Sequence, residues 1–368
     1  TNGNVRNVLN NFDKENGILK INDCLYRSNG YTGHVETEVN DEILDKVSAK
    51  SCVEKEEINS IVIQKGVEIV RCELSDYLNL KKFYLPASME CISYMDIKGC
   101  KNLECIVVEK GNERYTSIDG GLYRISKDCE TGEMCYVLIW YPAGKKDDVF
   151  KVPNGVMQIC NDALEGAKCK KVILAASTPS VNNGECDEDG NEYYHCCFNE
   201  CENLSEIEVE KGNKYYQAVD NVLYEIRKER KTGKRYARII YYPKNKAGEE
   251  WKIPEYIEVD GEEIEVREIV SYVFRNNRKV KRIIMPANIT EIGIDAFEGS
   301  CLKEVNYLGT PEEFAAIEIC EGNEVLGRAK IQYVSDKDEE MLDGDEEMLD
   351  GDIETEVIEM SDSEDDED

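Results

Sequence analysis

"CKNLECIVVEKGNERYTSIDGGLYR" (100–124) returns 101 residues later as "CENLSEIEVEKGNKYYQAVDNVLYE" (201–225), and this pair of segments decides the fold. Over the first 24 positions 13 residues are identical without a gap. The match continues further along the chain, because Thr131-Gly132 corresponds to Thr232-Gly233 and Tyr141-Pro142 to Tyr242-Pro243. A duplication this regular indicates an array of similar structural units.

A shorter repeat lies inside the long one. Two apolar residues three positions apart are followed, two positions later, by a third apolar residue. The last two alternate as the residues of a half-buried β-strand do. The triples are Leu80/Phe83/Leu85, Leu103/Ile106/Val108, Cys169/Val172/Leu174, Leu204/Ile207/Val209, Val280/Ile283/Met285 and Leu302/Val305/Tyr307.

A second pattern precedes most of these strands, as in "VMQICNDALEGAKCKKV" (156–172) and "ITEIGIDAFEGSCLKEV" (289–305). The whole unit recurs about every 22–23 residues where nothing is inserted, for example from Ile61 to Phe83. A unit this short can bury its apolar face only against neighbouring copies, so at least three must stack. The sequence predicts about six units between Ile61 and Val305.

The segments "FYLPASMECISYMDIKGCKNLECI" (83–106) and "IIMPANITEIGIDAFEGSCLKEV" (283–305) resemble the BspA-like, or Treponema-type, leucine-rich-repeat family. "VNYLGTPEEFAAIEI" (305–319) resembles the C-terminal end common in that family, with Phe314 in place of the usual Trp. The resemblance covers roughly residues 60–334. It implies a leucine-rich-repeat solenoid, a β-rich right-handed superhelix with a parallel sheet on its concave face. Short irregular or helical turns would form the convex face, and β-hairpins would be inserted at about 112–148 and 213–249.

Three parts follow from these patterns. Residues 1–59 form an N-terminal cap, in which "INDCLYRSN" (21–29) resembles a degenerate third copy of the hairpin motif. Residues 60–334 form the solenoid, and residues 335–368 form an acidic tail. Between Asp336 and Asp368 there are 19 acidic residues and one Lys. Like charges this dense repel one another, so the tail is predicted to be disordered.

The formal net charge is −32, of which the tail carries −18 and the first 335 residues carry −14. Binding to a phosphate backbone needs a basic surface, so nucleic acid is not an expected partner. Anionic membrane surfaces are disfavoured for the same reason. No apolar run approaches the ~18 residues of a membrane-spanning helix, and we expect a chain that does not span a membrane.

The concave face of the solenoid is the candidate binding surface. Side chains that point outward from the predicted strands form two columns, and contiguous exposed apolar surface tends to mark interaction sites. We therefore predict that a protein or glycan ligand contacts Tyr84, Val107, Ile173, Ile284, Lys82, Lys171 and Arg282. The alternative is that the apolar members reflect ordinary strand propensity or lie under a hairpin or the N-terminal segment.

Sixteen cysteines allow more than one interpretation. Cys100 and Cys201 share one repeat position, and we expect both to pack in the core as small hydrophobic residues. Cys129 and Cys135 flank the first hairpin turn, and they would form a disulfide in an oxidising compartment if they pair across the strands.

The segment "CDEDGNEYYHCCFNEC" (186–201) contains residues that bind metals. Its candidate zinc ligands are Cys186, His195, Cys196, Cys197 and Cys201. The repeat register assigns Cys197 and Cys201 to the core, which leaves a closed zinc site one ligand short. Asp187, Asp189 and Asn191 resemble the start of an EF-hand loop but lack its terminal Glu. Neither a metal nor a cofactor is therefore predicted.

An enzyme is not expected either. The chain has only His34 and His195 as histidines and no glycine-rich phosphate-binding loop. The family resemblance implies a secreted or cell-surface protein for adhesion or interaction. An intracellular interaction module whose acidic tail binds basic partners remains the alternative.

Overall fold

The structure is a computed structural model. It describes residues 12–13, 15, 18–21, 25–28, 35–40, 43–45, 54–92, 97–128, 131–186, 192–198, 201 and 203–334. The predicted disordered tail, and most of the predicted N-terminal cap, lie outside these residues. Internal contacts divide the chain into two units, which are described separately. The first contains residues 1–183, 197–204 and 208–213, and the second contains 184–196, 205–207 and 214–368.

The first unit contains the parallel sheet that the apolar triples predict. Its strand order is β1 (Phe12–Asp13), β2 (Ile18–Ile21), β5 (Ser60–Ile63), β7 (Lys82–Leu85) and β9 (Cys105–Val108). Strands β2, β5, β7 and β9 run parallel, with Ser60 opposite Lys82 and Lys82 opposite Cys105. Consecutive strands start at residues 60, 82 and 105, which matches the predicted period.

A second sheet accompanies the first. It contains β3 (Leu25–Ser28), β4 (Val35–Asn40), β6 (Ile69–Arg71) and β8 (Cys91–Ile92) in that order, and the short 3-10 helix η1 (Lys55–Glu57) precedes β5. Each turn of the repeat thus supplies one strand to each sheet, and the pair of strands is followed by an irregular segment such as 72–81. The irregular turns were predicted from the sequence, whereas the second sheet was not.

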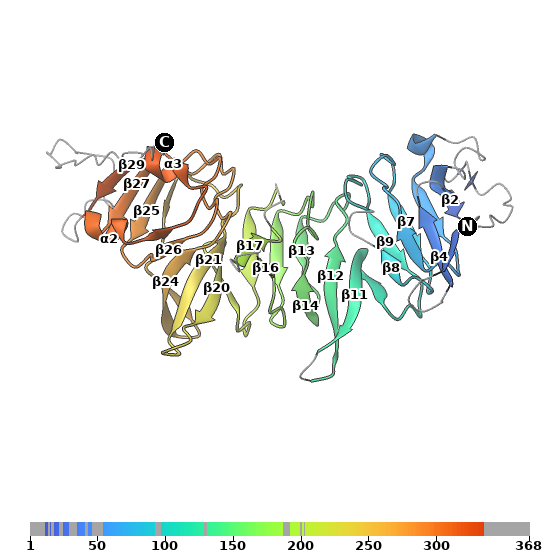
Figure 1. The fold of residues 1–368 in the computed structure, drawn as a ribbon, viewed down its shortest axis with the longest axis horizontal. Coiled ribbons are helices and arrows are strands. Elements are labelled where there is room, and N and C mark those ends of the chain that lie inside the picture. The colour runs from blue at the N-terminus through green and yellow to red at the C-terminus, as the bar shows by residue number, and fades with distance from the viewer. Residues whose placement is uncertain are drawn as a thin grey trace, which may run out of the picture. The chain divides into compact units, whose positions relative to one another are not determined.

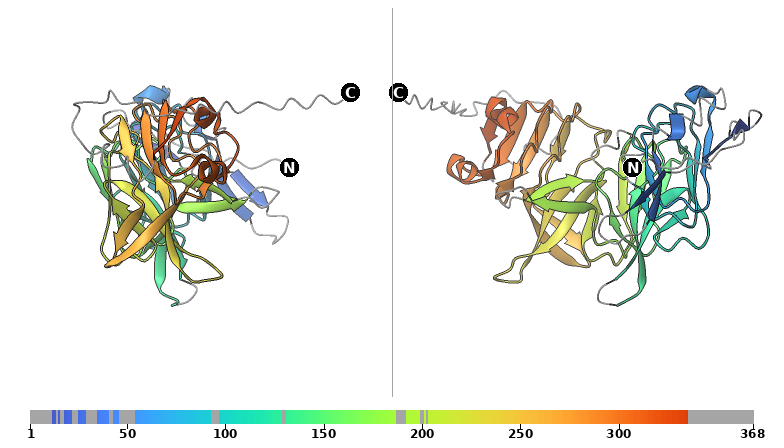
Figure 2. Two further views of the ribbon diagram at one scale, coloured as in Figure 1. Left: turned by 90° about the vertical axis from the view of Figure 1, so that its left-hand side faces the viewer. Right: turned by 45° about the vertical axis from the view of Figure 1, so that its right-hand side comes forward.

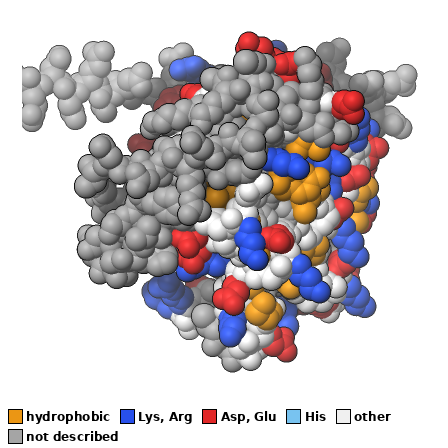
Figure 3. Space-filling view, turned by 90° about the vertical axis from the view of Figure 1, so that its right-hand side faces the viewer, with side chains coloured by type: hydrophobic (Ala, Val, Ile, Leu, Met, Phe, Trp, Pro, Cys, Tyr) orange, Lys and Arg blue, Asp and Glu red, His pale blue; other side chains and the backbone are white. Residues whose placement is uncertain are grey.

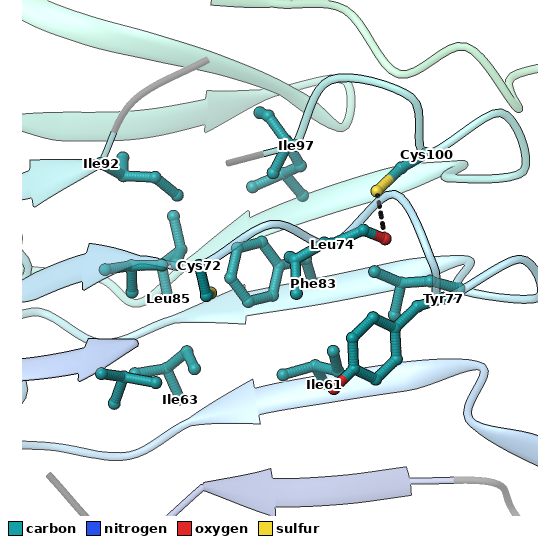
Figure 4. Close-up of a cluster of buried hydrophobic side chains, with 14 of the residues drawn as sticks. Ile61, Ile63, Cys72, Leu74, Tyr77, Phe83, Leu85, Ile92, Ile97 and Cys100 are labelled. Atoms are coloured by element: carbon teal, nitrogen blue, oxygen red, sulfur yellow. Dashed lines mark hydrogen bonds between the residues drawn. The ribbon is translucent and has the colours of Figure 1, made fainter. Parts of the chain in front are cut away.

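The core of the first unit lies among these strands. Figure 4 shows Ile61 and Phe83 from the first sheet meeting Leu74, Tyr77 and other side chains from the turns. Ile61, Phe83 and Leu74 are 0% exposed, and so are Leu19 and Ile106 on the neighbouring strands. Each unit contributes only a few apolar side chains, so the core is continuous only because the copies stack.

The first predicted hairpin follows β9. It is part of a four-stranded sheet in the order β10 (Tyr115–Ile118), β11 (Gly121–Lys127), β12 (Met134–Trp140) and β14 (Val156–Ile159). Asp119 and Gly120, with φ angles of 49° and 75°, form the two-residue turn between β10 and β11. Positive φ at both central residues is what a type I′ hairpin turn requires. Strand β14 pairs only with Tyr136–Leu138 of β12, so the far end of the hairpin extends past it (Figures 1 and 2).

Three further strands, β13 (Val149–Lys151), β15 (Lys171–Leu174) and β18 (Glu206–Val209), form another sheet. Strands β16 (Asn182–Cys186) and β17 (Glu192–Cys196) pair with each other. The boundary between the two units passes through β16 and β18, and Glu208 and Val209 belong to the first unit.

The second unit repeats the two-sheet arrangement. One sheet contains β19 (Tyr216–Val219), β20 (Val222–Lys228), β21 (Arg235–Tyr241), β24 (Glu262–Ile269), β26 (Glu291–Ile292) and β28 (Glu318–Ile319), with β23 (Tyr256–Val259) paired to β24. The other contains β22 (Glu250–Lys252), β25 (Arg282–Pro286), β27 (Glu304–Leu308) and β29 (Lys330–Tyr333). Helices α2 (Pro311–Ala315) and α3 (Glu324–Arg328) lie between the last strands in sequence. Aromatic rings fill its core, for example Phe274 stacked on Phe297 at 5.0 Å.

The hairpin of the second unit reproduces the first. Asp220 and Asn221 have φ angles of 49° and 62° in the turn between β19 and β20, and Gly233 has a φ of 70° at the hairpin tip. The N-terminal segment follows the same plan, because β3 is antiparallel to β4 and β4 is parallel to β6. The degenerate third copy of the hairpin motif at 21–29 stays a prediction.

Candidate ligand-binding face

The outward side chains of the first-unit sheet form the predicted columns. The register places Lys20, Val62, Tyr84 and Val107 side by side on β2, β5, β7 and β9. Their inward neighbours on the same strands are buried, as Phe83 and Ile106 show at 0% exposure. Because side chains alternate along a strand, the pattern of burial confirms the register that the apolar triples predicted.

Three apolar side chains of this column are half-buried, namely Val62, Tyr84 and Val107. We call them the apolar column. Lys20 and Lys82 beside it are exposed. Sequence reasoning missed Val62, although the short apolar run "SIVI" (60–63) is the signal that could have identified a preceding strand. In the space-filling view of Figure 3, hydrophobic side chains on the described surface form small groups bordered by charged residues.

The free edge of β9 is covered by the base of the first hairpin. The N–H of Ile106 donates to the carbonyl oxygen of Gly120 at 2.8 Å, and the N–H of Val108 donates to Oγ of Ser117 at 3.1 Å. These contacts use the amides on the outer side of β9, and among the described residues no strand follows β9 in this sheet. The hairpin therefore closes the edge beside Val107 and leaves the outward face of β9 uncovered by any strand of the sheet.

Lys171 and Ile173 lie on β15 in the sheet with β13. Ile173 is half-buried, as predicted for an outward position, and stands opposite Lys151. The ammonium group of Lys171 contacts the carboxylate of Glu208, and that of Lys151 lies 2.9 Å from Oε1 of Glu210. The charges of this sheet are therefore partly neutralised within the first unit.

Arg282 and Ile284 lie on β25 of the second unit. The guanidinium group of Arg282 contacts carboxylates on both neighbouring strands, Glu250 at 2.8 Å and Glu304 at 3.0 Å, and these two contacts raise its pKa. Ile284 is only 5% exposed, so the expectation that it is an exposed apolar residue is wrong. Lys252 and Asn306 stand opposite it on the two adjacent strands, and Asn306 is itself only 5% exposed.

The cysteine predictions fall into two groups. Cys100 and Cys201 are 3% and 0% exposed, and each thiol donates to a backbone carbonyl oxygen, of Leu74 at 3.2 Å and of Leu164 at 3.4 Å (Figure 4 for Cys100). Their expected place in the core is confirmed. Cys135 is buried on β12, but Cys129 lies outside the described residues, so the disulfide between them stays a prediction.

The cysteine-rich segment gives no metal site where the structure describes it. Cys196, Cys197 and Cys201 are buried at 1% exposure or less, as the repeat register required for the last two. Among the described residues no group of three or more His, Cys, Asp or Glu side chains is arranged to hold a metal ion. Asp187, Asp189 and Asn191 lie outside the described residues.

A groove of about 590 Å³ beside the second hairpin was not predicted. It is lined by Ile226, Arg227, Lys228, Glu229, Arg230, Tyr236, Arg267, Glu268 and Thr290. The guanidinium carbon of Arg267 lies 5.5 Å from the ring centre of Tyr236, while burial and the neighbouring Glu268 raise the pKa of that phenol. Arg267 also contacts Glu265 at 2.7 Å. Both residues of this ion pair lie on β24. The seven basic residues between positions 222 and 241 are the sequence feature from which this groove could have been predicted.

None of the helices in the described part of the chain is long and apolar enough to span a membrane. A family model described as "BspA type Leucine rich repeat region" matches the chain in six copies, over residues 45–130 and 255–317. Four of the six predicted apolar triples lie within these matched residues, whereas the triples at 169–174 and 204–209 lie outside them. A search of curated proteins found no match.

Three solved structures match part of this chain. A leucine-rich repeat protein from Eubacterium ventriosum has 16% identity and a TM-score of 0.44, over 81% of this chain and 69% of that one. A leucine rich cell surface protein from Faecalibacterium prausnitzii has 21% identity and a TM-score of 0.39, over 73% and 64%. The pneumococcal vaccine antigen PcpA has 18% identity and a TM-score of 0.30, over 68% and 48%. The match spans less than two thirds of the length of the last two. The family model identifies residues 45–130 and 255–317 as BspA-type leucine-rich repeats, and the apolar triples and the stacked parallel strands agree with it.

Proposed function

We propose that this chain is a non-enzymatic binding scaffold, secreted or displayed at the cell surface, whose apolar column contacts a protein or glycan ligand. Leucine-rich-repeat domains generally serve in protein interaction. Extended surfaces of stacked repeats suit that role, because many side chains face one partner at once. The secreted or surface location is supported by the family resemblance alone.

The half-burial of Val62, Tyr84 and Val107 carries the proposal. The repeat does not require apolar residues at outward positions, because Glu206 and Glu208 occupy them on β18 and are both exposed. Three adjacent apolar side chains that remain accessible lose contact with water when a ligand covers them. Burial of apolar surface is favourable by about 25 cal/mol per Å².

The surroundings of the apolar column define the chemistry of the ligand. Lys20 and Lys82 are exposed beside it. A ligand with an aromatic or aliphatic centre and acidic or hydroxyl groups at its rim would match both features. Ile173 on β15, with Lys151 opposite, offers a second half-buried apolar position in the same unit.

Substitutions on the column test the proposal. The triple variant Val62→Lys/Tyr84→Lys/Val107→Lys and the wild-type chain are applied to the same arrays of extracellular proteins and glycans. Leu78→Lys is the matched control, since Leu78 is 60% exposed and lies in a turn outside the sheet. Circular dichroism and thermal unfolding check that all three proteins are folded.

We expect at least one ligand to bind the wild type and the Leu78→Lys control but not the triple variant. Equal binding by all three folded proteins would reject the apolar column as the binding site. The location is tested by counting free thiols in protein purified from its native host, with and without reductant. Thiols that appear only after reduction support export, whereas 16 free thiols in both samples favour the intracellular alternative.

A further inference from the structure

The two hairpins share a turn and differ in charge. At both tips the N–H of a glycine, Gly132 or Gly233, donates at 2.9 Å to the carbonyl oxygen four residues earlier. The first tip, "SKDCETGEMC" (126–135), contains one basic and three acidic residues, whereas the second, "RKERKTGKRY" (227–236), contains six basic residues and one acidic residue. Either set supports the same hydrogen bond, so the turn does not require the basic residues of the second hairpin.

The groove of about 590 Å³ lies on this second hairpin, which β20 and β21 form (Figure 1). Arg227 on β20 stands directly opposite Tyr236 on β21. The guanidinium carbon of Arg267, on the next strand β24, lies 5.5 Å from the centre of the Tyr236 ring. The phenol ring therefore has an arginine on each neighbouring strand, and all three residues line the groove.

The first hairpin has neither the arginines nor the ring at these positions. Ser126 stands opposite Cys135, where the second hairpin has its Arg–Tyr pair. Strand β14 pairs with β12 in the register in which β24 pairs with β21, and this places Met157 at the position of Arg267. The fold therefore accepts small or apolar side chains at all three positions, and the basic and aromatic set is a property of the groove.

Two further cations of the lining, Lys228 and Arg230, are exposed, and in the described part of the chain neither forms an ion pair. Arg267 instead is held by Glu265, whose Oε2 accepts from Nε at 2.9 Å and from Nη2 at 2.7 Å. The groove thus combines two cations that are available to an anion with a third whose orientation is fixed. Arginine guanidinium groups bind sulfate, phosphate and carboxylate groups, often through two parallel hydrogen bonds.

The rest of the lining narrows the class of anion. The carboxylates of Glu229 and Glu268 and the hydroxyl of Thr290 also line the groove. A carboxylate repels an anionic group and accepts hydrogen bonds, so a suitable ligand needs hydroxyl donors beside its anionic groups. An acidic sugar carries both, whereas the side chains of an acidic peptide carry only acceptors. The volume also lies within the range of about 300–1,000 Å³ that is typical of sites for small ligands.

We propose that this groove binds a short acidic oligosaccharide. Its sulfate or carboxylate groups contact Lys228, Arg230 and Arg267, and its hydroxyl groups donate to Glu268. A long polyanion fits less well, because exposed Glu263 lies four residues before Arg267 on the same face of β24 and would repel a ligand that continued along this strand. The groove lies within the second unit, so the inference does not depend on the apolar column of the first unit.

Isothermal titration calorimetry of the full chain with a sulfated tetrasaccharide tests it. We expect the wild type to bind, and the affinity to fall as salt is added, because salt screens exposed charges. Lys228→Gln/Arg230→Gln should weaken binding by about tenfold or more, the size expected when hydrogen bonds to charged groups are lost. Arg278→Gln/Lys303→Gln is the matched control, which removes two exposed cations of the same unit outside the groove and should leave the affinity unchanged. Circular dichroism checks that all three proteins are folded.

Each other outcome counts against the proposal. It would be overturned if the wild type did not bind, or if the groove variant and the control had the same affinity. Equal binding of the desulfated tetrasaccharide would show that the anionic groups are not recognised, and equal binding of inorganic sulfate would reduce the groove to an adventitious anion site. If an oligoglutamate peptide or a DNA oligonucleotide of the same charge bound as tightly as the tetrasaccharide, charge alone would determine binding and the assignment to a sugar would be wrong.

Discussion

Nδ2 of Asn112 donates to the carbonyl oxygen of Met89 at 2.9 Å, which joins the loop after β9 to the turn after β7. The same nitrogen donates to Pro86 at 3.1 Å, while Oδ1 accepts from the N–H groups of Arg114 and Tyr115 at 2.8 and 2.7 Å. Asn112 is 8% exposed, so one buried amide satisfies four backbone groups. It fixes successive repeats to each other at the entrance to the hairpin.

We expect Asn112→Ala to lower the free energy of unfolding by roughly 3 kcal/mol. It leaves several buried backbone groups without partners, and each costs on the order of 1 kcal/mol or more. Asn102→Ala is the control, because Asn102 is exposed and its side-chain amide donates to the carbonyl oxygen of Leu78 at 2.7 Å. Urea unfolding measures both variants. A loss below about 1 kcal/mol in Asn112→Ala would contradict the role assigned to this residue.

Asn213 occupies the same repeat position in the second half of the chain and makes similar hydrogen bonds. Nδ2 of Asn213 donates to Ala175 and Thr178 at 2.9 and 3.0 Å. The pair Asn112 and Asn213 was visible in the sequence as one of the 13 identities of the long repeat. Their identity was predictable, but their role was not, because the partners lie 23 to 38 residues away and depend on how the turns stack.

Gly144 lies where two backbones approach closely. A Cβ atom added there would stand 2.4 Å from the carbonyl carbon and oxygen of Asn102, and the N–H of Gly144 donates to Leu103 at 2.7 Å. Backbone cannot move aside as a side-chain end can. We therefore expect Gly144→Ala to destabilise the first unit by about 2 kcal/mol, a size typical of overpacking, as measured by thermal unfolding.

Gly327 is the matched control for that substitution. It lies in helix α3, and an added Cβ would meet no atom within 4 Å. Alanine favours a helix over glycine by up to about 1 kcal/mol, so Gly327→Ala should be neutral or stabilising. If the two substitutions changed stability equally, contact with the backbone of Asn102 would not be what excludes a side chain at residue 144.

The buried cysteines should be chemically inert in the folded protein. Burial raises the pKa of the Cys100 thiol to about 12 and that of Cys169 to about 11. The thiolate is the reactive form, so alkylation near pH 8 should leave both unmodified. Exposed Cys91 serves as the internal control that reacts. Modification of Cys100 as fast as that of Cys91, located by mass spectrometry of the native protein, would contradict this prediction.

The parallel strands, the two hairpins and the buried cysteines could be predicted because they depend on local spacing. Phe83 and Ile106 recur at the repeat period, and their burial follows from stacking alone. The second sheet was not predicted because β6 and β8 have only three and two residues, too few for a visible alternation. The exposure of Ile284 was predicted wrongly, since its burial depends on which side chains the neighbouring strands place opposite it.

The second-unit sheet contains a row in which like charges meet. Arg238, Glu268, Glu291 and Glu318 stand opposite one another on β21, β24, β26 and β28. Arg238 contacts Glu268 at 3.6 Å at one end of the row. Burial raises the pKa of Glu291, and the carboxylates of Glu268 and Glu318 on either side raise it further, while Arg238 acts in the opposite direction.

When the pKa of a carboxyl group is raised in the folded state, the group is protonated at a higher pH in the folded protein than in the unfolded chain. Stability should therefore increase as the pH falls through the folded-state pKa of Glu291, and this gain is complete below the unfolded value of 4.5. At neutral pH the ionised Glu291 opposes folding. We expect Glu291→Gln to be more stable than the wild type near pH 7, with the difference shrinking toward zero below pH 4.5. Glu312→Gln, an exposed position outside the row, gives the effect of removing one surface charge. If the unfolding midpoint of Glu291→Gln changed with pH in the same way as that of the wild type, Glu291 would not be the group responsible for this pH dependence of stability.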